Sequence, residues 1–305
     1  MAIRHFLDID LLDKQTLRQI IDDAHEMKKC GKSLPKSYAA DHFEKAALIM
    51  IFEKPSTRTR VSFDIGMRQL GGESLVLNRE DLQLGRGESI VDTAKVLSRY
   101  GDAVMMRVMS HNTLEEFARH ATIPIINGLS DRTHPCQILA DIMTFEEHKG
   151  AIEGKTLAWI GDGNNVAVSF IHAAVLLGFK LRLGVPKTLM PDPAVLEWAE
   201  KEGGDIVITD DPVDAVKGAD CVVTDTWVSM GDKDKDARIK ILQPYAVTES
   251  LMGKAADDAI FMHCLPAYRE MEVSGEVIDG PRSVVFDEAE NRLHAQKAVI
   301  AWCLG

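Results

Sequence analysis

The chain has 305 residues, of which 46% are hydrophobic and 27% are charged, and its formal net charge is −12. This composition is typical of a globular protein, and the length predicts two domains of about 150 residues each. The acidic charge argues against nucleic acid or a membrane surface as a partner, because both favour a basic face. A small anionic substrate stays possible, since a few arginines in one cleft set the local potential.

The N-terminal residues do not resemble a signal peptide, because Arg4, Asp8 and Asp10 interrupt the apolar positions. No uncharged apolar run approaches the length of about 18 residues that a membrane span needs. The five cysteines are an odd number and include no CxxC pair. They indicate reduced thiols rather than a disulfide framework, so we expect a cytoplasmic protein.

Short apolar runs alternate with helix-patterned segments along the chain. The predicted strands are 46–52, 74–77, 103–108, 124–126, 156–160, 181–185, 205–208, 220–224, 259–262 and 283–286. The predicted helices include 13–29, 57–70, 88–99, 113–121, 134–148, 165–177, 193–202 and 287–303. This alternation predicts an α/β fold with mostly parallel sheets, whose apolar strands are buried on both faces.

The best domain boundary lies in or beside the predicted helix 134–148. We therefore place the first domain at 1–133 and the second at 134–286. The last segment, 287–305, contains a strongly apolar helix that suits packing on either domain.

Three hydroxyls and two guanidinium groups follow the first predicted strand, in Ser56-Thr57-Arg58-Thr59-Arg60. Pro55 ends the strand, and Ser56 is a good N-cap for the helix after it. A helix N-terminus offers unpaired N–H groups and a positive dipole end to an anion. The simpler interpretation is a cap with surface arginines, but we favour a site for the phosphoryl group of a small dianionic substrate.

A second polar motif, His134-Pro135-Cys136-Gln137, opens a predicted helix. His134 and Gln137 could be metal ligands, hydrogen-bonding groups for a substrate, or part of a helix cap. A metal is the weakest of these interpretations, because no second histidine or carboxylate lies at ligand spacing.

The segment Gly161-Asp162-Gly163-Asn164-Asn165-Val166 follows a predicted strand and resembles a dinucleotide fingerprint. Val166 occupies the third glycine position, and the next strand ends without a ribose-binding acid. A nicotinamide-dependent dehydrogenase is therefore disfavoured, and we expect a tight turn that offers Asn165 to a ligand.

Two further polar groups follow predicted strands, where ligands of parallel sheets bind. Asp225, in Asp225-Thr226-Trp227-Val228-Ser229-Met230-Gly231, could meet a substrate ammonium, or it could be a helix cap. Cys264, in His263-Cys264-Leu265-Pro266, could accept a proton or act as a nucleophile, although such a cysteine is more often simply buried. The charged residues 232–236 are expected to form a solvated loop.

In their order along the chain, these four motifs closely resemble the ornithine branch of the aspartate/ornithine carbamoyltransferase family, from about residue 5 to residue 303. The resemblance implies two doubly wound parallel-sheet domains with the active site in the cleft between them. The first domain would bind carbamoyl phosphate and the second the amino acid, and the last helix would pack on the first domain. The resemblance also implies a homotrimer with shared active sites, and neither a cofactor nor a metal.

The resemblance also assigns residues to roles. It implies a cis Leu265-Pro266 bond, and it gives Arg60 a supporting place. Arg107, His134 and Cys264 would be catalytic, with Cys264 or the phosphate itself accepting the proton. The implied contacts to carbamoyl phosphate are Ser56, Thr57, Arg58, Thr59, Gln83, Arg107, His134, Gln137, Cys264, Leu265 and Arg292. The implied contacts to ornithine are Asn165, Asp225, Ser229 and Met230.

The implied reaction transfers the carbamoyl group of carbamoyl phosphate to the side-chain amine of L-ornithine, which gives L-citrulline and phosphate. The Ser-Met-Gly and His-Cys-Leu-Pro motifs are intact, so ornithine is favoured over aspartate or a diamine as the acceptor. A non-catalytic relative is disfavoured because no catalytic position is degraded. The short chain favours a role in arginine biosynthesis, and a catabolic role stays an alternative.

Overall fold

The computed structural model describes residues 3–31, 33–35, 38, 43–82, 87–228 and 235–305. The chain folds as two compact units, which are Met1–Ala140 with Glu290–Gly305, and Asp141–Ala289. The boundaries fall inside helices α5 (Pro135–Lys149) and α12 (Val285–Leu304). They lie a few residues after the boundaries proposed from the sequence. Within the described residues, no helix has the length and apolar character that a membrane crossing requires.

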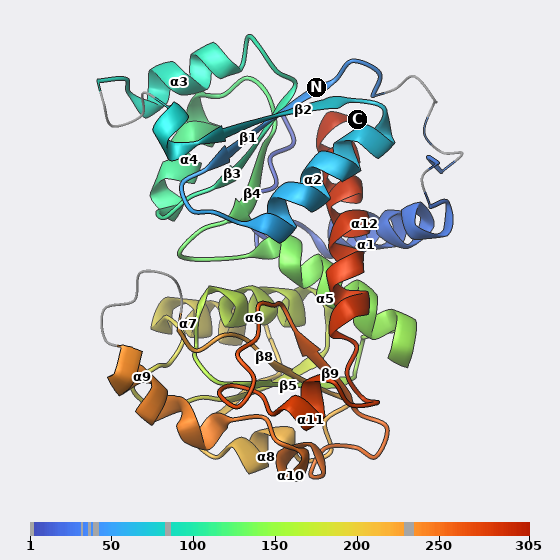
Figure 1. Ribbon diagram of the computed structural model, residues 1–305, viewed down its shortest axis with the longest axis vertical. Coiled ribbons are helices and arrows are strands. Elements are labelled where there is room, and N and C mark those ends of the chain that lie inside the picture. Colours follow the sequence, from blue (N-terminus) through green and yellow to red (C-terminus); the bar gives the residue numbers. More distant parts are fainter. Residues whose placement is uncertain (1–2, 32, 36–37, 39–42, 83–86, 229–234) are drawn as a thin grey trace. The chain divides into compact units, whose positions relative to one another are not determined.

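The first unit is built on a parallel four-stranded sheet with the order β2-β1-β3-β4. Its strands are β1 (Ala47–Phe52), β2 (Glu73–Asn78), β3 (Ala103–Arg107) and β4 (Ile125–Leu129). Its helices are α1 (Lys14–Lys29), α2 (Thr57–Leu70), η1 (Arg79–Asp81), α3 (Ile90–Leu97) and α4 (His111–His120). Figure 1 shows α3 and α4 on one face of this sheet and α2 with α12 on the other. The strands are buried on both faces, as their continuous apolar runs predict.

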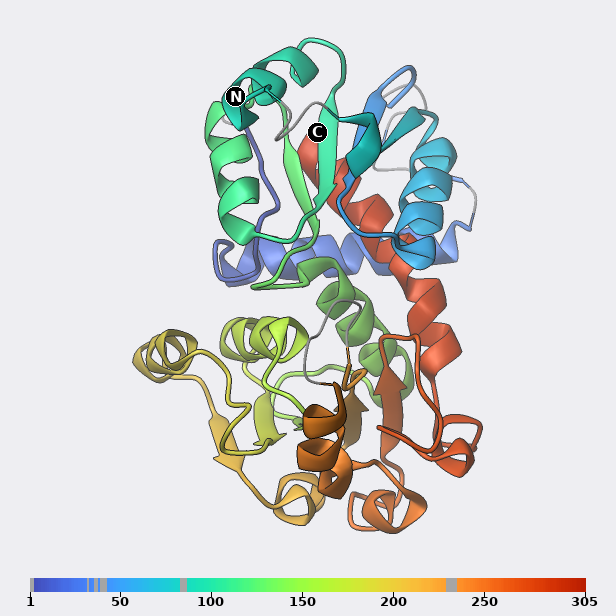
Figure 2. The same ribbon diagram turned by 60° about the vertical axis from the view of Figure 1, so that its left-hand side comes forward.

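Polar contacts hold the C-terminal part of α12 in the first unit, where Figure 2 shows it crossing α1. Lys28 donates to the side-chain oxygen of Asn291 over 2.8 Å. The buried Lys297 donates over 3.0 Å both to the carbonyl of Gly31 and to the side chain of Gln69. These bonds satisfy polar groups that would otherwise be costly to bury, and they fix the helix along its length.

The second unit contains a parallel five-stranded sheet with the order β7-β6-β5-β8-β9. Its strands are β5 (Thr156–Ile160), β6 (Lys180–Gly184), β7 (Ile206–Thr209), β8 (Cys221–Thr224) and β9 (Ile260–His263). Helices α6 (Asn165–Leu177) and α7 (Pro193–Lys201) cover one face, and α8 (Pro212–Val216) and α10 (Glu249–Met252) cover the other (Figure 1). The remaining helices are α9 (Lys235–Leu242), η2 (Gln243–Tyr245) and α11 (Gly275–Ile278). The predicted α/β class with two doubly wound parallel sheets is confirmed.

The predicted strand 283–286 is wrong, whereas each of the other predicted strands corresponds to a strand of the structure. Ser283 forms one isolated bridge with Phe261, and α12 already begins at Val285. Asp287 and Glu288 lie in the first turn of α12, where acidic side chains favour a helix start. The apolar residues here are therefore buried as the beginning of a helix.

The sequence patterns missed the short helices α8, α9, α10 and α11. Helices this short have little intrinsic stability and depend on tertiary packing, so periodicity detects them poorly. The expected solvated loop 232–236 is wrong at Lys235 and Asp236, which belong to the first turn of α9, and its residues 232–234 lie outside the described residues.

Gly163 lies where two backbone segments approach each other closely. Its N–H donates to the carbonyl of Leu189 over 2.8 Å. A Cβ at this position would overlap the backbone of Pro191 and lie 2.6 Å from the carbonyl carbon of Met190. The need for glycine at position 163 is therefore explained by packing against the 189–191 loop.

Gly163→Ala is expected to lower the free energy of unfolding by about 1–3 kcal/mol, because backbone atoms cannot move away as a flexible side chain could. Urea denaturation followed by circular dichroism measures this loss. Gly253→Ala is the matched control, because Gly253 has an ordinary φ of −68° and its nearest contact would be 3.3 Å. Equal midpoints for the two variants would contradict the close-approach explanation.

Candidate active site

The first group of predicted site residues lies at the topological switch point of the first sheet. From β1 the chain passes to β2 on one side, whereas β3 and β4 lie on the other. Ser56 to Thr59 follow β1, and Arg107 is the last residue of β3, where it pairs with Phe52. Ligands of open parallel sheets bind outside the carboxyl ends of the strands at such a point.

The N-terminus of α2 is formed as predicted, with the helix beginning at Thr57 and Ser56 at the N-cap in extended conformation. The hydroxyl of Ser56 makes no capping hydrogen bond to the helix in the described structure. Thr57 is exposed, Arg58 is half-buried and Thr59 is buried. The first turn thus retains donors that a bound anion could use.

Arg292 connects three segments that are far apart in the sequence. Its guanidinium donates to the side-chain oxygen of Gln137 through a very short hydrogen bond and to the hydroxyl of Thr59 over 3.3 Å. All three side chains are buried, with exposed fractions of 4%, 1% and 1%. The C-terminal helix therefore supplies a cation to the same point as α2 and the start of α5.

His134 is buried among cationic groups. Loss of solvation lowers the pKa of its imidazole well below the ordinary value of 6.5, and the charges of Arg292, Arg107 and Arg58 lower it further. The imidazole is consequently neutral at physiological pH. A neutral imidazole has one N–H donor and one acceptor nitrogen, which suits it to polarise a carbonyl oxygen without adding charge.

The loop before His134 is held by buried hydrogen bonds. Ser130 Oγ lies 2.8 Å from Nδ1 of the buried His111, and Asn127 donates to the hydroxyl of Thr133 over 3.1 Å. Cys136, which follows His134, donates its thiol to the carbonyl of Asn127 over 3.3 Å. These contacts indicate that Cys136 helps to position the loop, and burial raises its pKa to about 12.

The second group of predicted residues lies at the switch point of the second sheet, between β5 and β8. Asn164 caps α6, with its side-chain oxygen accepting from the N–H groups of Val166 and Ala167 over 2.9 and 3.1 Å. Its side-chain nitrogen donates to Asp225 over 3.1 Å. Asn165, the predicted ligand, is the first residue of α6 and is half-buried.

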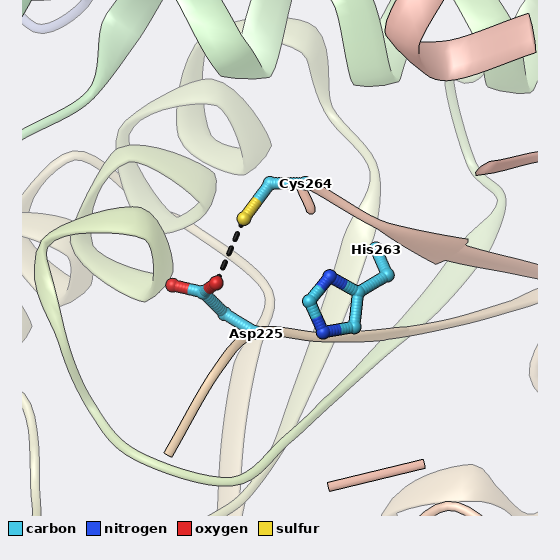
Figure 3. A group of neighbouring side chains, drawn as sticks. All are labelled: Asp225, His263 and Cys264. Carbon is cyan, nitrogen blue, oxygen red and sulfur yellow. Dashed lines mark hydrogen bonds between the residues drawn. The ribbon is translucent and has the colours of Figure 1, made fainter. Parts of the chain in front are cut away.

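Asp225 and Cys264 form a hydrogen-bonded pair from the ends of β8 and β9 (Figure 3). The thiol donates to a carboxylate oxygen of Asp225 over 2.8 Å. Loss of solvation, the charge of Asp225 and this hydrogen bond raise the pKa of Cys264 well above its ordinary value of 9. The thiol therefore keeps its proton, and this arrangement gives no support to the expectation that Cys264 accepts one.

Leu265, the next predicted residue, is half-buried and has a φ of 53°. An L-residue other than glycine pays about 1–2 kcal/mol for this left-handed conformation. The bond from Leu265 to Pro266 is cis, as the family resemblance implied.

One group of possible metal ligands lies within the second unit of the described structure. The ligand atoms of Asp225, His263 and Cys264 lie within 4.8 Å of one another. Each has a hydrogen-bond partner, because Cys264 donates to Asp225 and Nδ1 of His263 accepts from the N–H of Leu265.

Two residues that the sequence analysis did not select also contribute to this end of the second sheet. Asn164 holds Asp225, and its signal was the preference for asparagine at helix N-caps. Arg238 of α9 donates to the carbonyl of Trp227 over 2.6 Å and pairs with Asp162. Nothing in the sequence around Arg238 indicated this contact, because its partners lie in other segments of the chain.

The predicted site residues Gln83, Ser229 and Met230 lie outside the described residues. The structure therefore brings together Arg58, Thr59, Arg107, His134, Gln137 and Arg292 in the first unit. In the second unit it brings together Asp225 and Cys264. Leu265 follows Cys264 in the chain, and Asn165 follows Asn164, which donates to Asp225.

Two family models match the chain. Residues 4–147 match the carbamoyl-P binding domain of aspartate/ornithine carbamoyltransferases, and residues 153–303 match their Asp/Orn binding domain. The ornithine carbamoyltransferase of Rhodopseudomonas palustris strain BisA53 is 56% identical over 306 residues, which cover 100% of this chain and 98% of the relative. That of Nitrobacter winogradskyi is 58% identical over 307 residues, with the same coverage.

Solved structures agree with these matches. The ornithine carbamoyltransferase from Pyrococcus furiosus has a TM-score of 0.92 and 48% identity, and the match covers 98% of this chain and 96% of that one. The anabolic ornithine carbamoyltransferase from Campylobacter jejuni has a TM-score of 0.91 and 39% identity, with 99% of each chain covered. The chain belongs to the aspartate/ornithine carbamoyltransferase family.

Proposed function

We propose that this protein is an ornithine carbamoyltransferase, which transfers the carbamoyl group of carbamoyl phosphate to the side-chain amine of L-ornithine and releases L-citrulline and phosphate. The observation that carries the proposal is the neutral His134 with Arg58, Arg107 and Arg292 around it. Such a site suits a substrate that combines a phosphate dianion with a carbonyl group. The family membership supports the same reaction.

The first unit binds carbamoyl phosphate. Ser56, Thr57, Arg58 and Thr59 hold the phosphate at the N-terminus of α2, where backbone N–H groups and the helix dipole add to the arginine charge. Arg107 bridges phosphate and carbonyl oxygen. Gln137 and Arg292, already bonded to each other, hold the carbamoyl group. Gln83 reaches the substrate from a neighbouring subunit.

His134 and Arg107 stabilise the charge that develops on the carbonyl oxygen as the amine attacks. A single donor in such an oxyanion site is typically worth about 3 kcal/mol of transition-state stabilisation. The lowered pKa of His134 matters here, because a fourth positive charge would have to be desolvated among the arginines. The neutral ring provides a hydrogen bond without that cost.

The second unit binds ornithine through Asn165, Asp225, Ser229 and Met230. The side-chain amine of ornithine must lose a proton before it attacks the carbonyl carbon of carbamoyl phosphate. The bond between that carbon and the phosphate oxygen then breaks, and phosphate leaves. Because Cys264 is held as a thiol, we assign proton acceptance to Asp225 or to the leaving phosphate. Cys264 and Leu265 orient the amine and the carbamoyl group.

The protein acts as a homotrimer with shared sites, in the cytoplasm and in arginine biosynthesis. Val61 and Ile65 on α2 and Leu75 on the edge strand β2 support an interface on the first unit, because they are 53%, 39% and 56% exposed. The cysteines of the described structure are free, which suits a reducing compartment. The relative from Campylobacter jejuni, described as anabolic, supports the biosynthetic direction.

The deciding experiment is a citrulline assay with carbamoyl phosphate and L-ornithine, run beside L-aspartate and putrescine as acceptors. Product from ornithine alone is the expected outcome. If product formed from a different acceptor, the assignment of the carbamoyl phosphate site would stand and that of the amino-acid site would be overturned. Size-exclusion chromatography with light scattering on the same sample tests the trimer.

Arg58→Ala is expected to weaken carbamoyl phosphate binding by about 10- to 100-fold, because a hydrogen bond to a charged group is lost. Isothermal titration calorimetry measures the change in Kd. Arg60→Ala is the matched control, because Arg60 lies two residues further on the same helix but is exposed. Equal losses in the two variants would contradict a specific role for Arg58.

The rate of Cys264 alkylation by iodoacetamide should keep rising with pH beyond 9, because its raised pKa leaves little thiolate below that point. Asp225→Asn removes the neighbouring negative charge, so it should lower this pKa and speed alkylation at pH 8. Mass spectrometry of the Cys264 peptide follows the reaction. A rate that levels off below pH 9, or one unaffected by Asp225→Asn, would refute the thiol–carboxylate pair.

The same Asp225→Asn variant should lower kcat for citrulline formation by about 100-fold or more, because the proton acceptor next to the amine is lost. Steady-state kinetics at saturating carbamoyl phosphate measure this effect. If the variant kept full kcat, the departing phosphate would be the proton acceptor and Asp225 would have a binding role alone.

A further inference from the structure

A buried histidine and a buried glutamate lie behind the segment that carries Cys264 and Leu265. His263, the last residue of β9, and Glu272 are both fully buried, with exposed fractions of 0%. Nε2 of His263 lies 3.5 Å from Oε1 of Glu272. The mechanism above uses neither side chain. Burying a histidine and a carboxylate is costly, so the pair calls for an explanation beyond filling the core.

Each side chain accepts a hydrogen bond from the backbone of the segment 264–268, which carries Cys264 and Leu265. The N–H of Leu265 donates to Nδ1 of His263 over 2.9 Å, and the N–H of Tyr268 donates to Oε1 of Glu272 over 2.5 Å. These two bonds lie on either side of Pro266, which has no N–H of its own. Together they fasten the segment at both ends.

The hydrogen bond to Leu265 fixes the state of the imidazole. Because Nδ1 accepts, the proton of the neutral ring is on Nε2, which faces Glu272. The backbone N–H of His263 donates to the buried carboxylate of Glu288 over 2.8 Å. The ring thus lies beside the carboxylate of Glu272 without a hydrogen bond to it, while the backbone of the same residue is held by the carboxylate of Glu288.

Leu265 needs such support because its φ of 53° is unfavourable for a residue with a Cβ. The apolar side chain of leucine cannot make the local hydrogen bond by which asparagine or aspartate stabilises this conformation. Strained conformations persist only where the surrounding structure imposes them, and they gather at functional sites. The contact with His263 is a direct candidate for that constraint.

We propose that His263 is a positioning residue that holds Leu265 in the left-handed conformation, while Glu272 holds the segment at Tyr268, and that His263 thereby orients Cys264 and Leu265 toward the reacting groups. Figure 3 shows the His263 ring beside Asp225 and Cys264 without a hydrogen bond to either. The residue therefore acts through the backbone of Leu265. The link to catalysis depends on the ornithine carbamoyltransferase activity proposed above, whereas the link to the conformation of the segment does not.

Two amide variants separate this role from simple burial. In His263→Asn the side-chain oxygen occupies the position of Nδ1 and can still accept from Leu265. In His263→Gln the amide lies near the position of Nε2, so it can face Glu272 but cannot accept that bond. The two variants are equally neutral and polar, and they differ by one methylene group. Phe261→Leu, which creates a cavity on the same strand, is the control for lost stability without a lost segment contact.

We expect His263→Gln to lower kcat by about 100-fold, because a small misplacement of orienting groups has an effect of that size. His263→Asn and Phe261→Leu should keep kcat near that of the wild type, although their melting temperatures fall. The alkylation rate of Cys264 should change in His263→Gln and stay near the wild-type rate in His263→Asn. This second readout needs no substrate.

Equal kcat and equal alkylation in the two amide variants would overturn the proposal, whether both match the wild type or both are impaired. If His263→Gln does not fold, His263→Asn still decides, since a large loss of kcat there would refute the role of the Nδ1 bond. A wild-type protein that makes no citrulline would reject the proposed function instead, and the alkylation rates would then test the positioning role alone.

Discussion

The carboxyl ends of parallel strands are the constraint on which the site residues of this protein depend. In each sheet the strand order reverses once, between β1 and β3 in the first unit and between β5 and β8 in the second. At these points successive loops leave in opposite directions and expose polar groups that the buried strands cannot carry. Ser56 to Thr59 and Arg107 arise at one switch point, and Asn164 and Asp225 arise at the other.

The two switch points differ in their electrostatics. In the first unit, burial lowers the pKa of His134 and the charges of three arginines lower it further, so the imidazole stays neutral. In the second, burial and then the carboxylate of Asp225 raise the pKa of Cys264, so the thiol stays protonated. A cationic site suits a phosphorylated substrate, and an anionic one suits an amine. Both are local features in a chain whose net charge is −12, so overall charge would not have revealed either.

Three of the proposed contacts, Asp225, Leu265 and Gln137, are each hydrogen-bonded to another residue that holds them. Asn164 caps α6 and holds Asp225 with the same amide group. His263 accepts a hydrogen bond from the N–H of Leu265, and Arg292 donates to Gln137. Buried polar groups need such partners to be tolerated at all. The same hydrogen bonds therefore satisfy the buried polar groups and orient the proposed substrate contacts.

Much of the fold could be predicted from the sequence because it rests on local patterns. Continuous apolar runs identified the strands of both parallel sheets, and their polar ends located Ser56, Arg107 and Asp225. The pattern failed at 283–286, where an apolar run begins α12. It also missed α8 to α11, which are too short to be stable without tertiary contacts.

The sequence by itself determined the fold class, the motifs and the residues at the strand ends, because these follow from periodicity and from short-range turn chemistry. Only the tertiary structure decided the protonation states of His134 and Cys264 and the roles of Asn164 and His263. A pKa depends on burial and on charges that come from distant segments, as Arg292 comes to His134. The partner of a polar group inside the fold likewise depends on the tertiary structure: Asn164 and Asp225 are 61 positions apart, and no local sequence pattern indicates their contact.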